Sequence, residues 1–220
     1  MKFKKVKLIA KTQGLGELEG KSIGEIMAYA ARVSNPNNQN NHTTSGKLLT
    51  YCLKHGHVSV FETASLTFEI TTSRAIAAQI LRHRSFTFQE FSQRYSEVDE
   101  CEIYEARSQD LKNRQNSIDD MSEEIKGWFI GAQEHIKELG FYMYKEALHR
   151  GIAKEQARFL LPLSTQTTLY MTGSIRSWIH YLDRRCGSDV QKEHRDIALD
   201  IKRIVIEVVP ELEDYFNTVE

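Results

Sequence analysis

The sequence lacks the features that mark membrane, secreted and nucleic-acid-coating proteins. Its 220 residues hold no apolar run near the length of a membrane span, and the amino-terminal residues MKFKKVKLIAK lack a signal peptide's cleavage pattern. The three cysteines, Cys52, Cys101 and Cys186, are odd in number and widely spaced, which argues against a disulfide framework. A net charge of −1 is too small for a protein that binds along a phosphate backbone. We therefore expect a cytoplasmic protein with reduced thiols and one domain over residues 1–220.

Strands and helices alternate along the chain without a repeat or a linker. Period-two alternation predicts strands, and 3.6-residue spacing predicts helices. The expected strands are 2–10, 64–73 and 164–172, and the expected helices are 22–34, 44–55, 73–81, 153–161 and 174–186, with a polar loop at 35–41. Ser188 and Gln191 resemble a capping box that opens another helix, which Pro210 ends before a last short helix. This order predicts an α+β fold.

A long helix is expected after an acidic connector that follows residue 95. One face of this helix is apolar at helical spacing, and we expect that face to be core scaffold. Its apolar residues are Met121, Ile125, Trp128, Phe129, Ala132, Ile136 and Leu139.

The stretch RHRSFTFQEFSQRY, residues 82–95, combines arginines, hydroxyl side chains and phenylalanines. Arginine forms bidentate contacts with phosphate, and neither a GxGxxG nor a GxxxxGK[ST] segment offers another phosphate site. A solvated basic face is one alternative, and aromatic stacking of a single-stranded nucleic acid is another. The interleaved phenylalanines indicate partial burial, which makes unpaired arginines costly. We therefore favour a small anion, such as a mononucleotide or a dinucleotide cofactor.

The segment CLKHGHVSVFE raises the question of a metal site. Cys52, His55 and His57 are possible ligands, but zinc needs three or four ligands in tetrahedral geometry and no second Cys or His pair follows at a matching spacing. We expect no metal, with Cys52 at a helix core position. Arg158 and Arg185 lie on amphipathic helices, where each taken alone could pair with a surface carboxylate.

Residues 82–95 resemble the signature of the flavin-dependent thymidylate synthases. That signature is Arg-His-Arg, two residues, Ser, four residues, Ser, one residue and Arg-Tyr, and only Thr87 departs from it, with its hydroxyl kept. The resemblance continues in AARVS, HGHVSVFE, ARFLLPL, TGSIRSWIHYLDRR and QKEHR, and so covers most of the chain. It implies an antiparallel sheet packed with several helices, one of them long, in a single domain that forms a homotetramer with flavin sites between subunits.

The resemblance also implies the ligands and the residues that hold them. Enzymes of this family methylate dUMP with methylenetetrahydrofolate, use FAD, and take electrons from NADPH. By resemblance, the dUMP residues are Gln79, Arg82, Glu90, Ser92, Gln93, Arg94, Arg158 and Arg185. The FAD residues are Ser34, Ser59, Glu62, Arg82, His83, Arg84, Ser174, Arg176, His180 and Asp189, and the folate-side residues are His57 and Tyr95. Serine and aspartate stand at positions 174 and 189, where the family often has asparagine and histidine.

Arg185 is the residue expected to be catalytic. Negative charge develops on the uracil carbonyl side during the reaction, and a fixed guanidinium stabilises it. The unrelated thymidylate synthases that use a cysteine usually place proline before it, and no proline here adjoins a cysteine. Two alternatives stay open: a non-catalytic relative that binds flavin or nucleotide for regulation, and an RNA-binding module with salt-sensitive oligonucleotide binding.

Overall fold

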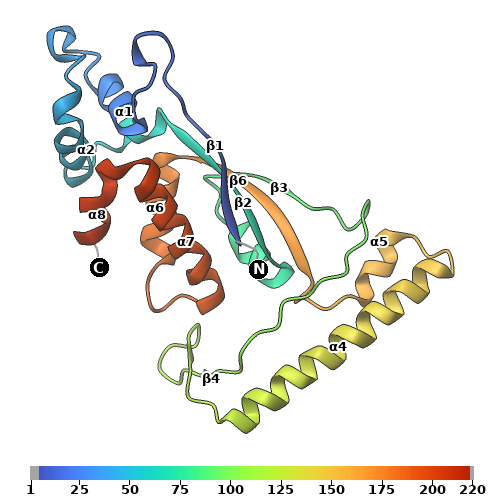
Figure 1. The fold of residues 1–220 in the computed structure, drawn as a ribbon. Coiled ribbons are helices and arrows are strands. Elements are labelled where there is room, and N and C mark those ends of the chain that lie inside the picture. Colours follow the sequence, from blue (N-terminus) through green and yellow to red (C-terminus); the bar gives the residue numbers. More distant parts are fainter. Residues whose placement is uncertain (1–4, 219–220) are drawn as a thin grey trace.

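The computed structural model describes residues 5–218 and shows an α+β fold. Four antiparallel strands form the main sheet in the order β1-β2-β6-β3, with bounds Val6–Lys11, Ser65–Ser73, Gln166–Ser174 and Thr87–Glu90. The helices are α1 (Ile23–Ala31), α2 (Ser45–Lys54), α3 (Arg74–Ile80), α4 (Glu123–His149), α5 (Lys154–Ala157), α6 (Ile175–Arg185), α7 (Lys192–Val208) and α8 (Glu213–Thr218). The expected fold class is confirmed (Figure 1).

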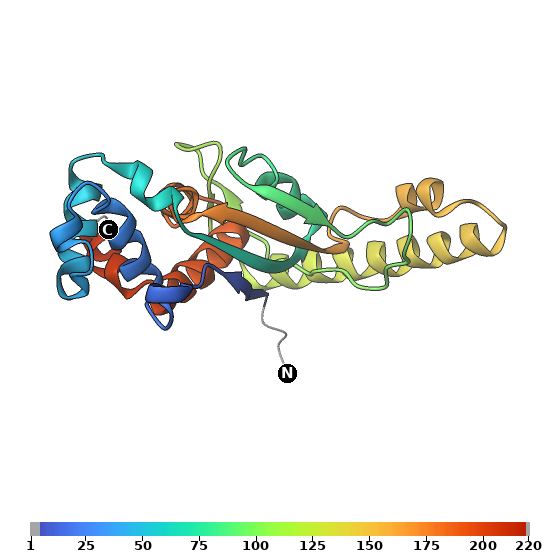
Figure 2. The same ribbon diagram turned by 90° about the horizontal axis from the view of Figure 1, so that it is seen from above.

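The core lies between the sheet and the helices α6 and α7. Leu66, Phe68 and Ile70 alternate along β2 and are buried, as their spacing predicts. Two cross-strand threonine pairs join β2 and β6 through their hydroxyls, Thr67 with Thr172 at 2.9 Å and Thr71 with Thr168 at 3.2 Å. The Trp178 ring on α6 meets Phe68 edge to face at 4.8 Å between centroids. Figure 2 shows α1 and α2 at one end of the molecule and the end of α4 with α5 at the other.

Each of the two central strands leads directly into a helix through a serine. The Ser73 side chain accepts from the backbone N–H of Ile76, and that of Ser174 accepts from Ser177, so both serines are N-caps. Because β2 and β6 are antiparallel, with Ser73 opposite Gln166, α3 and α6 begin at opposite ends of the sheet. The C-terminal residues of both helices then line one cavity, and this topology positions the site.

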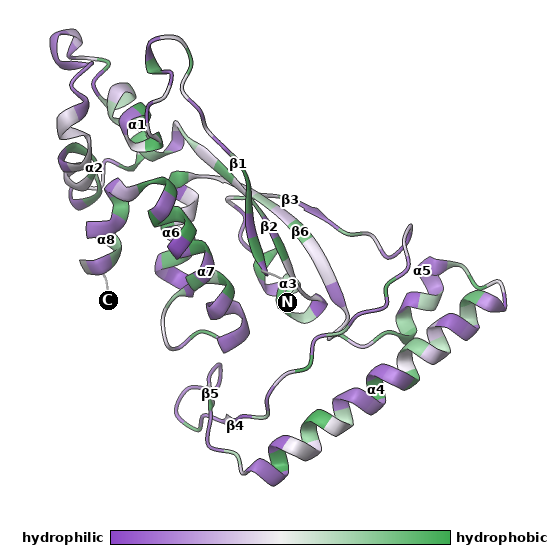
Figure 3. Ribbon diagram, viewed as in Figure 1, coloured by the Kyte–Doolittle hydropathy of each residue, from purple (hydrophilic) through white to green (hydrophobic). Residues whose placement is uncertain are grey.

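The long helix α4 is confirmed, but the expectation that its apolar face is core scaffold is wrong. α4 runs apart from the sheet, and apolar residues still mark its length (Figures 1 and 3). Trp128 is 70% exposed and Ile136 56%, and the buried residues of α4 are Phe141, Tyr144 and Ala147, near α5. Apolar spacing predicts that one face of a helix is apolar, but it does not determine whether other parts of the same chain cover that face.

One local expectation is wrong, and two loops contain short regular elements. The expected capping box is absent, because α7 begins after Gln191, which makes no side-chain cap bond. The loop around Pro36 contains two 3-10 turns, Pro36–Asn38 and His42–Thr44. Residues 82–95 are a turn followed by β3, and the connector after them holds a small hairpin of β4 (Ser108–Gln109) and β5 (Ser117–Ile118).

The other predicted elements lie close to their expected ranges, and residues 2–4 of the first expected strand lie outside the described residues. The final helices follow Pro210 as a 3-10 turn, Pro210–Leu212, and α8. The predicted 153–161 helix is α5 followed by a 3-10 turn, Arg158–Leu160, and a further 3-10 segment, Val58–Glu62, precedes β2. Cys52 is buried in α2 as expected. Within residues 5–218, no helix is long and apolar enough to cross a membrane.

Candidate functional site

The first part of the signature segment is a turn fixed to the sheet by Phe86. The backbone N–H groups of His83 and Phe86 donate to the carbonyls of Ile80 and His83, which closes the turn after α3. Phe86 is buried, 4.6 Å between centroids from Trp178, and its ring lies over Gly173 of β6. The turn therefore presents Arg82, Arg84 and Ser85 outward.

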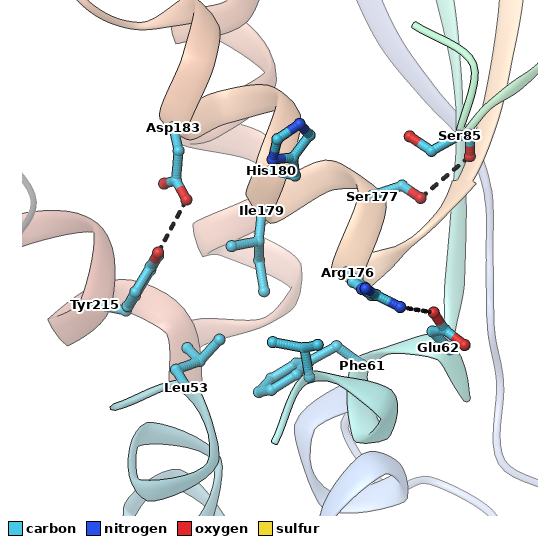
Figure 4. Close-up of a pocket in the computed structure, with 11 residues that line it drawn as sticks. Leu53, Phe61, Glu62, Ser85, Arg176, Ser177, Ile179, His180, Asp183 and Tyr215 are labelled. Carbon is cyan, nitrogen blue, oxygen red and sulfur yellow. Dashed lines mark hydrogen bonds and ion pairs between the residues drawn. The ribbon is translucent and has the colours of Figure 1, made fainter. Parts of the chain in front are cut away.

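A first cavity of about 600 Å³ lies between the 3-10 segment Val58–Glu62 and α6. Its apolar side includes Leu53, Phe61 and Ile179, and its polar side is drawn in Figure 4. There Arg176 pairs with Glu62, and the Ser177 hydroxyl donates to the Ser85 carbonyl at 3.1 Å.

Asp183 and His180 line both this cavity and its neighbour on the other side of α6. The Tyr215 hydroxyl donates to Asp183 at 2.9 Å. Burial raises the pKa of Asp183, and that hydrogen bond opposes the rise only in part. The two cavities thus share one carboxylate and one imidazole.

The second cavity, of about 840 Å³, lies where α3 and α6 both end. The residues that line it include Gln79, Arg82, His83, Arg185 and Asp189. Arg185 Nε donates to His83 Nε2 at 2.9 Å. Burial, and then the positive charge of Arg185, lower the pKa of His83 to about 4. A neutral His83 therefore accepts this hydrogen bond and leaves both terminal nitrogens of Arg185 for a ligand.

The other predicted dUMP residues lie elsewhere on the chain. Thr87 of β3 pairs with Thr172 and Glu90 with Leu169, so β3 leads away from the start of α6 toward α5 (Figure 1). None of Glu90, Ser92, Gln93, Arg94 and Arg158 lines the second cavity. Within a single chain, three of the eight predicted dUMP residues, Gln79, Arg82 and Arg185, therefore lie together at the second cavity, and the other five do not.

That second group has partners of its own. Glu90 accepts from Arg74 at 2.6 Å, and Gln93 is buried and also bonds to Arg74. Arg94 Nε lies 3.5 Å from Glu155 Oε2, and the two side chains are 57% and 50% exposed, respectively. An exposed pair of this kind contributes little to stability, which leaves the Arg94 guanidinium available for an anion.

The predicted flavin residues are distributed over three places. Glu62, Arg176 and His180 line the first cavity, with Ser59 in the adjoining 3-10 segment, and Arg82, His83 and Asp189 line the second. Ser34 lines a separate hollow beside Arg32 and Lys47. The Ser174 hydroxyl caps α6, and Arg84 is exposed.

The predicted folate-side residues are not neighbours within the chain. The His57 ring lies 6.1 Å between centroids from Tyr51, and the next residue, Val58, lines the first cavity, whereas the Tyr95 carbonyl accepts from Lys154 of α5. Tyr95 itself is 77% exposed. No cluster of three or more His, Cys, Asp or Glu side chains that could hold a metal occurs in the described part of the chain.

Several lining residues were missed by the sequence argument. Asp183 stands in the segment HYLDRR, where its place beside two arginines was a usable signal. Tyr215, Gln115 and Gln191 carry no such signal, because each reaches a cavity from a distant part of the chain.

The similarity of this chain to known proteins shows the family to which it belongs. Residues 20–211 match the family described as Thymidylate synthase complementing protein. The chain is 57% identical over 185 residues to the flavin-dependent thymidylate synthase of Synechocystis sp., covering 84% of this chain and 85% of that one. The chain belongs to the flavin-dependent thymidylate synthase family.

Two further relatives agree with this membership. The probable flavin-dependent thymidylate synthase of Paramecium bursaria Chlorella virus 1 is 54% identical over 189 residues, covering 86% of this chain and 88% of that one. The crystal structure of a UMP/dUMP methylase, PolB from Streptomyces cacaoi, bound with 5-Br dUMP, superposes with a TM-score of 0.83 at 25% identity over 97% of this chain and 94% of that one. This chain therefore shares the fold of that solved structure.

Proposed function

We propose that this family member converts dUMP to dTMP, with methylenetetrahydrofolate as the one-carbon donor and FAD, reduced by NADPH, as the source of hydride. Family membership and the fold of a dUMP-binding relative support this proposal. The single observation that carries it is the Arg185 guanidinium, held by neutral His83 at the end of α6. We propose one such domain over residues 1–220, in the cytoplasm, where free thiols are the rule.

Arg185 has the geometry of a charge-stabilising residue. Its Nε is occupied by His83, so the two remaining nitrogens can donate to a pyrimidine carbonyl in the second cavity. A donor held in place before the reaction needs no reorganisation as charge develops, which is the source of its catalytic effect. Gln79 and Arg82 line the same cavity and are proposed to bind the nucleotide.

The residues present fit a flavin dinucleotide. The two cavities adjoin across α6 through His180 and Asp183, which suits a ligand with two bulky ends. Within residues 5–218, the guanidinium groups of Arg82 and Arg84 have no hydrogen-bond or ion-pair partner, and Arg176 is half exposed beside Glu62. These cations offer bidentate contacts to a pyrophosphate. When bound, FAD supplies the hydride, while the chain orients it and excludes water.

A homotetramer completes the site in this proposal. The proposed phosphate residues Ser92, Arg94 and Arg158 do not line the cavity of Arg185 in one chain, so a neighbouring subunit would supply them. The exposed apolar face of α4 supports such an assembly, because exposed patches of this kind mark interaction surfaces.

The test is dTMP formation from dUMP and methylenetetrahydrofolate by the purified protein under low oxygen, with and without FAD and NADPH. Product that depends on both FAD and NADPH is the expected result. Arg203→Ala is the matched control, since Arg203 is 71% exposed on α7 and, among residues 5–218, pairs only with Asp200. Binding of FAD and dUMP without product would contradict the proposal and favour a non-catalytic relative.

A further inference from the structure

His194 of α7 is a buried histidine that touches a proposed nucleotide residue. Its side chain has no solvent exposure, and its ring nitrogens face two partners. Nε2 is 3.0 Å from the Tyr181 hydroxyl, and Nδ1 is 3.3 Å from Gln79 Oε1. Burial, and then the charge of Arg185, lower the pKa of His194 to about 3. The ring is therefore neutral near pH 7 and carries one N–H.

The carboxylate of the preceding residue, Glu193, determines which ring nitrogen of His194 carries that hydrogen. Glu193 pairs with Arg107, and both side chains are 11% exposed. Burial alone would raise the pKa of Glu193, but the hydrogen bond from Arg107 and other donors outweigh it, and the pKa is lowered. An ionised carboxylate only accepts hydrogen bonds, so Gln191 must turn its Nε2 toward Glu193 Oε2, 2.9 Å away.

The orientation of Gln191 then determines which atom of each following side chain donates and which accepts. Gln191 Oε1 faces Gln79 and accepts from Gln79 Nε2 at 2.6 Å. Gln79 Oε1 consequently faces His194 and needs a donor, which can only be Nδ1–H. With the proton on Nδ1, Nε2 accepts from the Tyr181 hydroxyl. The Arg107–Glu193 pair thus sets the orientation of the whole row of side chains.

We propose that His194 is a positioning residue that, through Nδ1–H, holds the Gln79 carboxamide in one orientation at the cavity of Arg82 and Arg185. The inference rests on the proposed function in one respect, that Gln79 is there a dUMP ligand. Each amide atom of Gln79 has one bond inside the protein, so one N–H and one oxygen lone pair stay available in a fixed order. A flipped amide would exchange donor and acceptor toward a pyrimidine edge.

Two isosteric substitutions separate this role from a structural one. In His194→Asn the side-chain amide can take the place of Nδ1–H, whereas in His194→Gln it reaches the Nε2 position and leaves Gln79 without its donor. Each variant leaves one neighbour unsatisfied, so both should lose similar thermal stability. We expect the FAD-loaded H194Q enzyme to bind dUMP about tenfold more weakly, mostly as a raised KM, and H194N to remain within about threefold of the unsubstituted enzyme.

A double-mutant cycle with Gln79→Ala completes the test. If His194 acts through Gln79, H194Q should have no further effect on dUMP affinity in the Q79A enzyme. Equal loss in H194N and H194Q, or an unchanged H194Q effect in the Q79A background, would overturn the inference. If Q79A itself binds dUMP normally, the inference also fails, whereas dTMP formation by the unsubstituted enzyme would leave the proposed function standing.

Discussion

Gly173 of β6 is the position where one added methyl group should disturb the signature turn. A Cβ at this residue would lie 2.5 Å from two ring carbons of Phe86 and 3.3 Å from the Ser177 Cβ. Real Cβ atoms do not approach so closely, and the Phe86 ring cannot retreat, because it packs against Trp178 at 4.6 Å and Tyr181 at 5.9 Å. Overpacking of this kind costs about 1–3 kcal/mol.

We therefore expect Gly173→Ala to lower the free energy of unfolding by about 1–3 kcal/mol, or the melting temperature by roughly 2–4 °C per kcal/mol. FAD should also bind more weakly, because the displaced ring belongs to the same turn as His83 and Ser85. Thermal and urea unfolding measure the first effect, and a flavin fluorescence titration measures the second. The two effects should appear together.

Gly46→Ala is the matched control for this substitution. Gly46 lies in α2, and an added Cβ there would meet only Glu211 atoms at 3.8 and 3.9 Å, which is ordinary contact. Alanine is the better helix former, so G46A should be neutral or stabilising. The Gly173→Ala penalty should shrink when Phe86 is also replaced by leucine. An unchanged melting temperature in G173A, or an equal penalty in both backgrounds, would refute the packing argument.

Three further outcomes follow from the same contacts. Arg185→Ala should lower kcat by about 100-fold or more while FAD binding and the assembly persist, and activity equal to that of Arg203→Ala would contradict its role. Trp128→Ser should weaken the oligomer in size-exclusion chromatography, whereas Leu111→Ser, at a residue 93% exposed on the hairpin, should not; equal elution of both would exclude α4 as the interface. The folded pKa of His194, about 3, lies below the unfolded value near 6.5, so the unfolded chain gains the proton first and stability falls as pH drops below about 6.5. His194→Asn should reduce that fall by about 1.4 kcal/mol per pH unit in urea unfolding from pH 6 down to 4, and an identical slope would show that His194 is not the titrating group.

Local sequence determined the strands, the helices and the types of residue at the site. The alternate spacing of Leu66, Phe68 and Ile70 predicts a half-buried strand, because alternate side chains of a strand share one face. Similarity to the family's motifs predicted Arg82, in the signature, and Arg185, in the later segment HYLDRR, as site residues, and both line the second cavity. These features depend on residues that are close together in the sequence, or on motifs that can be identified from the sequence alone.

Tertiary structure alone decided what those residues touch. Arg185 meets His83 across 102 positions, and Gln79 meets His194 across 115, so no local period could pair them. The apolar face of α4 was correctly recognised as apolar, yet only the fold shows that it lies outside the core. The predicted dUMP residues divide into two groups because β3 carries Glu90 and Arg94 away from α6. Periodicity specifies which side of an element is apolar, whereas packing specifies what that side meets.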